Sequence, residues 1–222
     1  MGKTALVFGS SGLVGSALVQ WLESSPAYDR IRLFLRTPIP HSQGKTEFIP
    51  VDFNQLERIA PQIEGDEVFC CLGTTIRKAG SQAAFRKVDA EYPSKIASIA
   101  RQNGVKGFYV VSSLGASADS GNFYLRTKGE MEQAVLQAQF PEYGIFRPSL
   151  LLGSRKEFRF GEKLAQWTMP LFHWMLNGRL RKYRGIRAAD VAKAMVIAAS
   201  MKFDDHVFES DRIAEIAKNH NI

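Results

Sequence analysis

Short apolar runs rich in β-branched residues alternate along the chain with stretches of helical spacing, and turn residues separate them. The runs that predict strands are 4–8, 31–35, 48–51, 67–71, 107–111 and 143–146. Apolar positions three and four residues apart predict helices over about 13–23, 92–103, 128–139 and 188–201. Strands that are apolar throughout, between helices, are typical of a parallel sheet covered on both faces. The pattern predicts a doubly wound α/β fold, a single domain over residues 1–222, with a small substrate-side elaboration from about 150 to 187.

The first predicted strand runs into a glycine-rich turn and then an amphipathic stretch. This arrangement places backbone N–H groups and a helix N-terminus against a phosphate. In the GxxGxxG spacing, Gly9 permits a tight turn, Gly12 lets a pyrophosphate approach and Gly15 lets the helix pack closely. Such turns also connect strands to helices without a ligand, but the position after a buried strand favours a dinucleotide site. The expected contacts are Gly9, Ser10, Ser11, Gly12, Leu13, Val14 and Gly15.

The end of the second strand indicates which dinucleotide is bound. An NAD-preferring site carries Asp or Glu at about this point to hold the ribose 2′-hydroxyl, whereas this chain has Arg36 and Thr37. A cation followed by a hydroxyl suits a 2′-phosphate, although Arg36 could also be an ordinary surface residue. The sequence therefore predicts NADP(H), in preference to NAD(H), as the cofactor.

Further candidate cofactor contacts follow later strands, where an open parallel sheet presents its ligand crevice. Gly73 would permit close approach of the nicotinamide ribose, and a neighbouring threonine could bond phosphate. Asp52 could accept a hydrogen bond from the adenine amino group, or could simply form a turn. The full set expected here is Asp52, Phe53, Leu72, Gly73, Thr74, Thr75 and Pro148.

Tyr124 and Lys128 have YxxxK spacing, so on a helix they share one face. A tyrosine hydroxyl has a pKa near 10 when free, and a nearby cation lowers it, so that the phenol can exchange a proton with a carbonyl or alcohol. The lysine can also bond the cofactor ribose. A serine at the preceding strand end, Ser112 or Ser113, could hold the substrate oxygen. The alternative is a half-buried aromatic side chain and a surface lysine.

The net charge of +7 arises in one segment, because nine cations and two carboxylates lie between Arg155 and Arg187. This basic segment favours an anionic ligand, an acidic protein partner or a membrane surface, or is an ordinary solvated face. No nucleic-acid-binding motif accompanies it, so nucleic acid is not expected. Aromatic residues interleaved with its cations would suit a lid over an aromatic or anionic small-molecule substrate.

Cys70 and Cys71 are adjacent in an apolar run, which indicates reduced core residues of a cytoplasmic protein. No leader precedes the first strand, and no apolar run reaches the roughly 18 residues that a membrane span needs. No histidine pairs with a carboxylate or cysteine at metal spacing. We therefore expect a cytoplasmic monomer or homodimer with no bound metal and no membrane span.

Four segments resemble the atypical short-chain dehydrogenase/reductase family, and more closely its Tat-interactive-protein-like branch of oxidoreductases. They are residues 9–15, 71–80, 111–132 and 146–162, within a likeness that covers most of the chain. The resemblance implies a Rossmann-type NADP-binding fold. It also implies that Tyr124 is the acid/base, Lys128 its pKa-lowering and ribose-binding partner, and Ser113 the substrate-orienting hydroxyl, with Ser112 as a rival. The asparagine that completes a proton relay in classical members has no obvious counterpart.

These features predict NADPH-dependent reduction of a carbonyl or similar small acceptor, with hydride from the cofactor and a proton from Tyr124. The alternative function is a non-catalytic NADP(H)-binding regulator or redox sensor that contacts a protein partner through residues 155–187. The intact tyrosine–lysine pair favours the enzyme.

Overall fold

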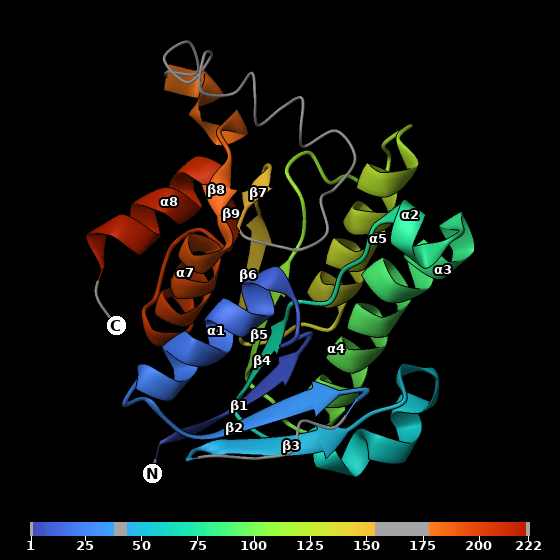
Figure 1. The fold of residues 1–222 in the computed structure, drawn as a ribbon, viewed down its shortest axis with the longest axis vertical. Helices are drawn as coiled ribbons and strands as arrows, with labels where there is room; N and C mark the ends of the chain where they lie inside the picture. The colour runs from blue at the N-terminus through green and yellow to red at the C-terminus, as the bar shows by residue number, and fades with distance from the viewer. Residues whose placement is uncertain (1, 38–43, 154–177, 221–222) are drawn as a thin grey trace.

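Parallel strands form the centre of the molecule (Figure 1). The computed structural model describes residues 2–37, 44–153 and 178–220. Within these residues, seven strands form one parallel sheet in the order β3-β2-β1-β4-β5-β6-β9. Their bounds are β1 Lys3–Phe8, β2 Tyr28–Leu35, β3 Thr46–Pro50, β4 Glu67–Cys70, β5 Gly107–Val111, β6 Glu142–Arg147 and β9 Val207–Glu209. The chain order reverses between β1 and β4, and at such a switch point the carboxyl ends of the strands leave a ligand crevice.

Helices cover both faces of this sheet (Figure 1). One face is covered by α1 Leu13–Ser24, α7 Ala188–Ser200 and α8 Ser210–Asn219, and the other by η1 Phe53–Gln62, α4 Tyr92–Gln102 and α5 Phe123–Gln137. Helix α4 continues from α3 Gln82–Arg86 through a π-helical turn, η2 Lys87–Glu91, and α2 Ile76–Ala79 precedes α3. A two-stranded parallel sheet joins β7 Leu151–Leu152 to β8 Ile186–Arg187, which follows η3 Gly178–Tyr183.

Strand β1 is apolar from Ala5 to Phe8, where both of its faces are buried. Ala5 and Val7 point into the core beneath α1 and α7. Leu6 and Phe8 point into the opposite core beneath α4 and η1. All four side chains are fully buried, and burial of each large one stabilises the fold by about 1.5–3 kcal/mol. A strand buried on both faces has no solvent-facing position for a polar residue.

The predicted doubly wound, Rossmann-type class is confirmed by this architecture. The predicted strands all form, but two predicted helices begin earlier in the structure and several elements were not predicted. The helix expected over 128–139 begins at Phe123 because the Asn122 side chain accepts a hydrogen bond from the Leu125 backbone N–H at 3.2 Å. The helix expected over 92–103 extends back to Gln82 through η2. The short β9 and helix α8 were not predicted.

The C-terminal elaboration is described only in part. Its β7–β8 pair and η3 lie within the described residues. Most of the expected lid and of the basic segment, residues 154–177, lies outside the residues that the structure describes.

Candidate functional site

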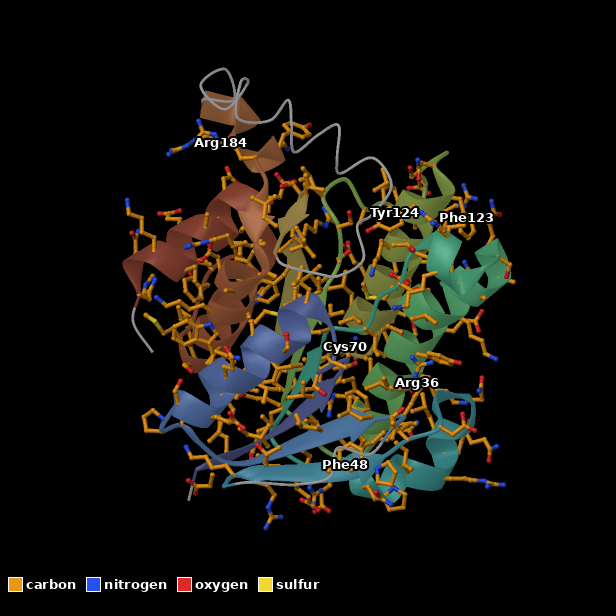
Figure 2. The ribbon with its side chains drawn as sticks, viewed as in Figure 1. Arg36, Phe48, Cys70, Phe123, Tyr124 and Arg184 are labelled. Atoms are coloured by element: carbon orange, nitrogen blue, oxygen red, sulfur yellow. The ribbon has the colours of Figure 1, made fainter. Side chains whose placement is uncertain are left out.

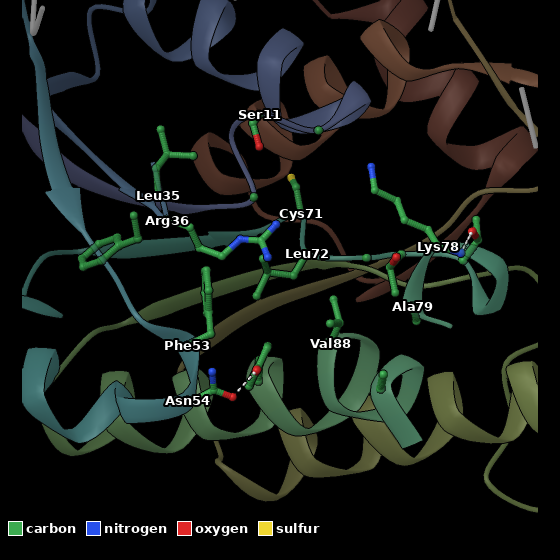
Figure 3. Close-up of a pocket in the computed structure, with 18 of the residues that line it drawn as sticks. Ser11, Leu35, Arg36, Phe53, Asn54, Cys71, Leu72, Lys78, Ala79 and Val88 are labelled. Carbon is green, nitrogen blue, oxygen red and sulfur yellow. Dashed lines mark hydrogen bonds between the residues drawn. The ribbon is translucent and has the colours of Figure 1, made fainter. Parts of the chain in front are cut away.

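A cavity of about 680 Å³ lies at the carboxyl edge of the sheet, where the glycine turn after β1 faces the loop after β4 (Figure 3). This volume is in the range of small-molecule and cofactor sites, roughly 300–1,000 Å³. The cavity is lined by Gly9, Ser11, Gly12, Phe34, Leu35, Arg36, Asp52, Phe53, Asn54, Cys71, Leu72, Gly73, Thr74, Thr75, Lys78, Ala79, Ala84, Val88 and Tyr92. The cavity therefore combines ten of the expected cofactor contacts with nine residues that were not expected.

The glycine turn forms the first wall of the cavity. Gly9 has a φ of +85°, and a Cβ atom there would lie 2.7 Å from the Cys71 carbonyl group, so only glycine fits. The Gly12 N–H donates to the Gly9 carbonyl oxygen at 3.0 Å, which closes the turn. Helix α1 then begins at Leu13, so its N-terminus lies beside the cavity. This is the geometry that binds phosphate.

The other residues of the glycine turn do not line the cavity. The Ser10 side chain is buried, and its hydroxyl has no hydrogen-bond partner among the described residues. Leu13, Val14 and Gly15 form the first turn of α1. A Cβ atom on Gly15 would lie 2.2 Å from the Gly9 carbonyl oxygen, so this glycine permits the close approach of helix and turn.

A second part of the cavity wall comes from the ends of β2 and β3 and from α4. The Phe53 and Tyr92 rings are stacked with centroids 5.3 Å apart, and the Tyr92 hydroxyl donates to Asn54 Oδ1 at 2.9 Å. Figure 3 shows Arg36 extending into the cavity above Phe53. The Asp52 carboxylate also accepts the Asn54 backbone N–H at 2.9 Å, so it caps η1 as well as lining the cavity. These residues place two aromatic rings and a cation at this end of the cavity. Thr37 is exposed and does not line the cavity.

The loop after β4 forms the third part of the wall. Leu72, Gly73 and Thr74 line the cavity as expected, and the Thr75 hydroxyl accepts the Lys78 backbone N–H at 3.1 Å to cap α2. Figure 3 shows the Lys78 side chain extending toward the cavity. Lys78 falls in the 71–80 segment that carries the family resemblance, which was the signal that could have identified it.

The two cysteines have different positions. Cys70 is a buried core residue as expected, but Cys71 lines the cavity, because it is the first residue beyond β4. Cys71 packs against the core as expected, but it is only partly buried and its exposed part lines the cavity. Burial raises the pKa of Cys70 to about 12 and also raises the pKa of Cys71. Both free thiols are protonated at neutral pH, and a protonated thiol is a poor nucleophile.

Tyr124 and Lys128 lie on one face of α5, in contact with the helix formed by α3 and η2. The Tyr124 ring is half-buried, with its centroid 5.5 Å from that of Phe85. The Lys128 ammonium forms an ion pair with Asp89 at 2.9 Å, and both side chains are buried. Lys128 is therefore not a surface residue. Its Nζ lies 4.0 Å from the position that a Cβ on Gly73 would occupy, which places the ammonium behind the cavity wall.

The charge on Lys128 depends on its partners. Burial by itself lowers the pKa of this ammonium, but the charge of Asp89 and the hydrogen bond to its carboxylate raise the pKa, as does Tyr124 when it is ionised, so the pKa lies above its ordinary value. Lys128 is consequently a cation at neutral pH. Asp89 was missed in the sequence because it is a single acidic residue in a helical stretch, with no spacing that relates it to Lys128.

The two candidate serines differ in burial and in the hydrogen bonds that they form. The Ser112 side chain is buried and its hydroxyl donates to Glu132 Oε1 at 2.5 Å. Glu132 is also ion-paired with Arg147, whose Nε lies 2.9 Å from the same oxygen. Ser113 is partly exposed, and its carbonyl oxygen accepts the Ala116 N–H at 3.1 Å.

Pro148, a further expected cofactor contact, is buried, and its carbonyl oxygen accepts the Leu114 N–H at 3.0 Å. None of Ser112, Ser113 and Pro148 lines the cavity.

The described residues contain neither a metal-binding cluster nor a membrane-spanning helix. Across residues 2–37, 44–153 and 178–220, no group of three His, Cys, Asp or Glu side chains is placed to hold a metal ion. Over the same ranges, no helix has the length and apolar character needed to cross a membrane.

Comparison with known proteins places the chain among nucleotide-binding proteins. Residues 9–202 match the family described as NAD(P)H-binding. Protein HTATIP2 of Rattus norvegicus is 37% identical over 168 residues, which cover 74% of this chain and 69% of that protein. Protein FMP52, mitochondrial, of Candida albicans is 36% identical over 203 residues, which cover 87% and 86%. The structure of MoeE5 in complex with UDP-glucuronic acid and NAD superposes with a TM-score of 0.67 at 19% identity, over 92% of this chain and 74% of that chain.

The expectation of a cytoplasmic protein is contradicted by these relatives. The FMP52 proteins of Candida albicans and of three further species are named mitochondrial. The expectation rested on two cysteines without a disulfide and on the lack of a recognisable leader. Free thiols report reducing surroundings and do not distinguish one reducing compartment from another.

Proposed function

Because the chain belongs to the NAD(P)H-binding family of atypical short-chain dehydrogenases/reductases, we propose that it is an NADP(H)-dependent reductase of a carbonyl or similar small acceptor. One observation carries the proposal: a Tyr124–Lys128 pair lies on α5, and its buried ammonium reaches the wall of a cavity that fits a dinucleotide. A cavity lined by a helix N-terminus suits a pyrophosphate, and Arg36 offers a cation to a 2′-phosphate.

The proposed chemistry divides between the cofactor and this chain. NADPH, when bound, supplies the hydride, and the protein supplies binding, orientation and a proton. Tyr124 gives its hydroxyl proton to the carbonyl oxygen of the acceptor. The charged Lys128 ammonium stabilises the phenolate that remains on Tyr124. The same ammonium has three N–H donors, so it can pair with Asp89 and also bond the cofactor ribose.

We assign the substrate-orienting hydroxyl to Ser113. Ser112 was the rival, but its hydroxyl is donated to Glu132 within a buried ion pair. Redirecting that hydroxyl toward a substrate would leave a buried carboxylate with one hydrogen bond fewer, at a cost of about 1–3 kcal/mol. Ser113 is partly exposed, and none of the described hydrogen bonds involves its hydroxyl group.

Replacing Arg36 by alanine is expected to weaken NADPH binding by about 1.5–3 kcal/mol, because a charge-assisted hydrogen bond to the 2′-phosphate is lost. Binding of NADH, which lacks that phosphate, should change little. Isothermal titration calorimetry with both nucleotides measures the two effects. Arg30→Ala is the matched control, because Arg30 is an exposed arginine of β2 that does not line the cavity, whereas Arg36 directly follows β2 and lines it. Equal losses for NADPH and NADH would contradict the assignment of NADP(H).

Turnover itself is tested with a panel of aldehydes, ketones and quinones, by following NADPH consumption in the absorbance of the reduced nicotinamide. We expect at least one acceptor to be reduced, and NADPH to be used in preference to NADH. Tight binding of NADPH without consumption by any acceptor would favour the alternative, an NADP(H)-binding regulator.

A further inference from the structure

Among the contacts between the helix formed by α3 and η2 and helix α5, two involve the tyrosine–lysine pair itself. Phe85 and Asp89 lie four residues apart on the first helix, and Tyr124 and Lys128 lie four residues apart on α5. The Phe85 and Tyr124 rings are 5.5 Å apart, and Asp89 Oδ1 is 2.9 Å from Lys128 Nζ. Residues at this spacing share a helix face, so the two helices meet along matching pairs of side chains.

The second oxygen of Asp89 reaches the cofactor cavity. Asp89 Oδ2 accepts the backbone N–H of Thr74 at 2.8 Å, and Thr74 lines the cavity. One carboxylate therefore ties the catalytic helix to the loop after β4. The Asp89 side chain is 2% exposed, so neither bond competes with solvent.

Asp89 lies in the only π-helical turn among the described residues, η2. A π turn inserts an extra residue into a helix and is frequent at functional sites. The turn breaks the regular phase of the long helix at the residue that pairs with Lys128. A surface role for Asp89 would not require such a turn.

The carboxylate also sets the electrostatics of the lysine. The groups that face the Lys128 ammonium are Asp89 of η2, Tyr124 of α5 and Cys70 of β4. Cys70 is protonated at neutral pH, so Asp89 is the anion that balances the buried ammonium. A buried ammonium without an anion loses its proton more readily, because burial penalises the charged form.

We infer that Asp89 is a positioning residue, which holds the Lys128 ammonium charged and fixed relative to the Thr74 loop so that it meets the nicotinamide half of NADP(H). The part of this inference that concerns turnover rests on the proposed function. The part that concerns nucleotide binding can be measured without turnover.

The Asp89→Asn variant removes the charge and keeps the shape and an acceptor oxygen. We expect its affinity for NADPH to fall about 10- to 100-fold, as for loss of a charge-assisted contact. Adenosine 2′,5′-bisphosphate lacks the nicotinamide half and uses the Arg36 end of the cavity, so its affinity should not change. Glu91→Gln is the matched control, because Glu91 is an exposed carboxylate in the same π turn. Equal losses for both ligands, or no loss for either, would overturn the inference.

The pH dependence separates positioning of a charge from a merely structural role. In Asp89→Asn, Lys128 loses its anion and its pKa falls, so a lower pH restores the ammonium. The affinity of the variant for NADPH, taken as a ratio to wild type, should therefore recover as the pH falls. The ratio cancels the titration of the 2′-phosphate itself. A ratio that does not vary with pH would count against the inference.

Two further measurements complete the test. In a Lys128→Ala background, Asp89→Asn should have no further effect on NADPH affinity, because the two residues act as a unit. If Asp89→Asn does not fold, the inference can still be tested on the wild-type protein by NMR. The ¹³Cε resonance of Lys128, identified by its absence in Lys128→Ala, should report a charged ammonium throughout about pH 6–9. A neutral amine in that range would overturn the inference. Binding that behaves as expected without any turnover would refute only the proposed function.

Discussion

Replacing Tyr124 by phenylalanine is expected to lower the kcat of NADPH-dependent reduction by about 10²- to 10⁴-fold, which is the usual contribution of a positioned general acid. The affinity for NADPH should remain close to that of wild type. The variant loses only the hydroxyl, while the ring keeps its contact with Phe85 at 5.5 Å and Lys128 keeps its ion pair with Asp89. A loss in kcat without a loss in binding is the signature of an interaction made only in the transition state.

The measurement needs a substrate that the wild-type protein demonstrably reduces, and steady-state rates together with NADPH titration. Tyr143→Phe is the matched control, because Tyr143 lies near the amino end of β6, opposite the cavity edge, where it stacks on His206. Figure 2 shows Tyr124 at the start of α5, with Cys70 between it and Arg36 in this view. A Tyr124→Phe variant with wild-type turnover would mean that another group delivers the proton.

The fold could be predicted because it depends on local patterns. Strand β1 is apolar at each position from Ala5 to Phe8 because both of its faces are buried there, and this pattern is visible in the sequence. Strand β9 was missed because it has only three residues and Val207 is 40% exposed, so it has no apolar run. Its pairing with β6 depends on tertiary packing that the sequence does not reveal.

The sequence predicted the residues of the candidate site only where they belong to a motif of fixed spacing. The glycine turn and the YxxxK pair have fixed spacings, and Gly9, Gly12 and Arg36 line the cavity while Lys128 lies behind its wall. Asp89 had no such spacing, because its two partners come from a different helix and from a loop. The sequence could not rank Ser112 and Ser113 either, and our proposal of Ser113 rests on the burial of Ser112 and its bond to Glu132.

Replacing Gly129 by alanine is expected to destabilise the protein, although the same change in an ordinary helix stabilises by about 1 kcal/mol. A Cβ atom at Gly129 would lie 2.2 Å from the backbone nitrogen of Ala118 and from the carbonyl carbon of Ser117. Backbone atoms cannot rotate away as a side chain can, so α5 must shift from the 117–118 segment. Such overpacking costs about 1–3 kcal/mol and occasionally more, which outweighs the gain in helix propensity.

The shift would also reach the site, because Gly129 directly follows Lys128 on α5. Displacement of a reacting group by about 1 Å can cost about 10²-fold in rate, so turnover should fall along with stability. Thermal unfolding should show a Tm lower by about 4–8 °C for a net loss of about 2 kcal/mol. Gly121→Ala is the control, since Gly121 is exposed and its Cβ would have nothing within 4 Å. If Gly129→Ala were as stable as wild type, α5 would not be held against the 117–118 segment, and the fixed placement of Tyr124 and Lys128 would need another cause.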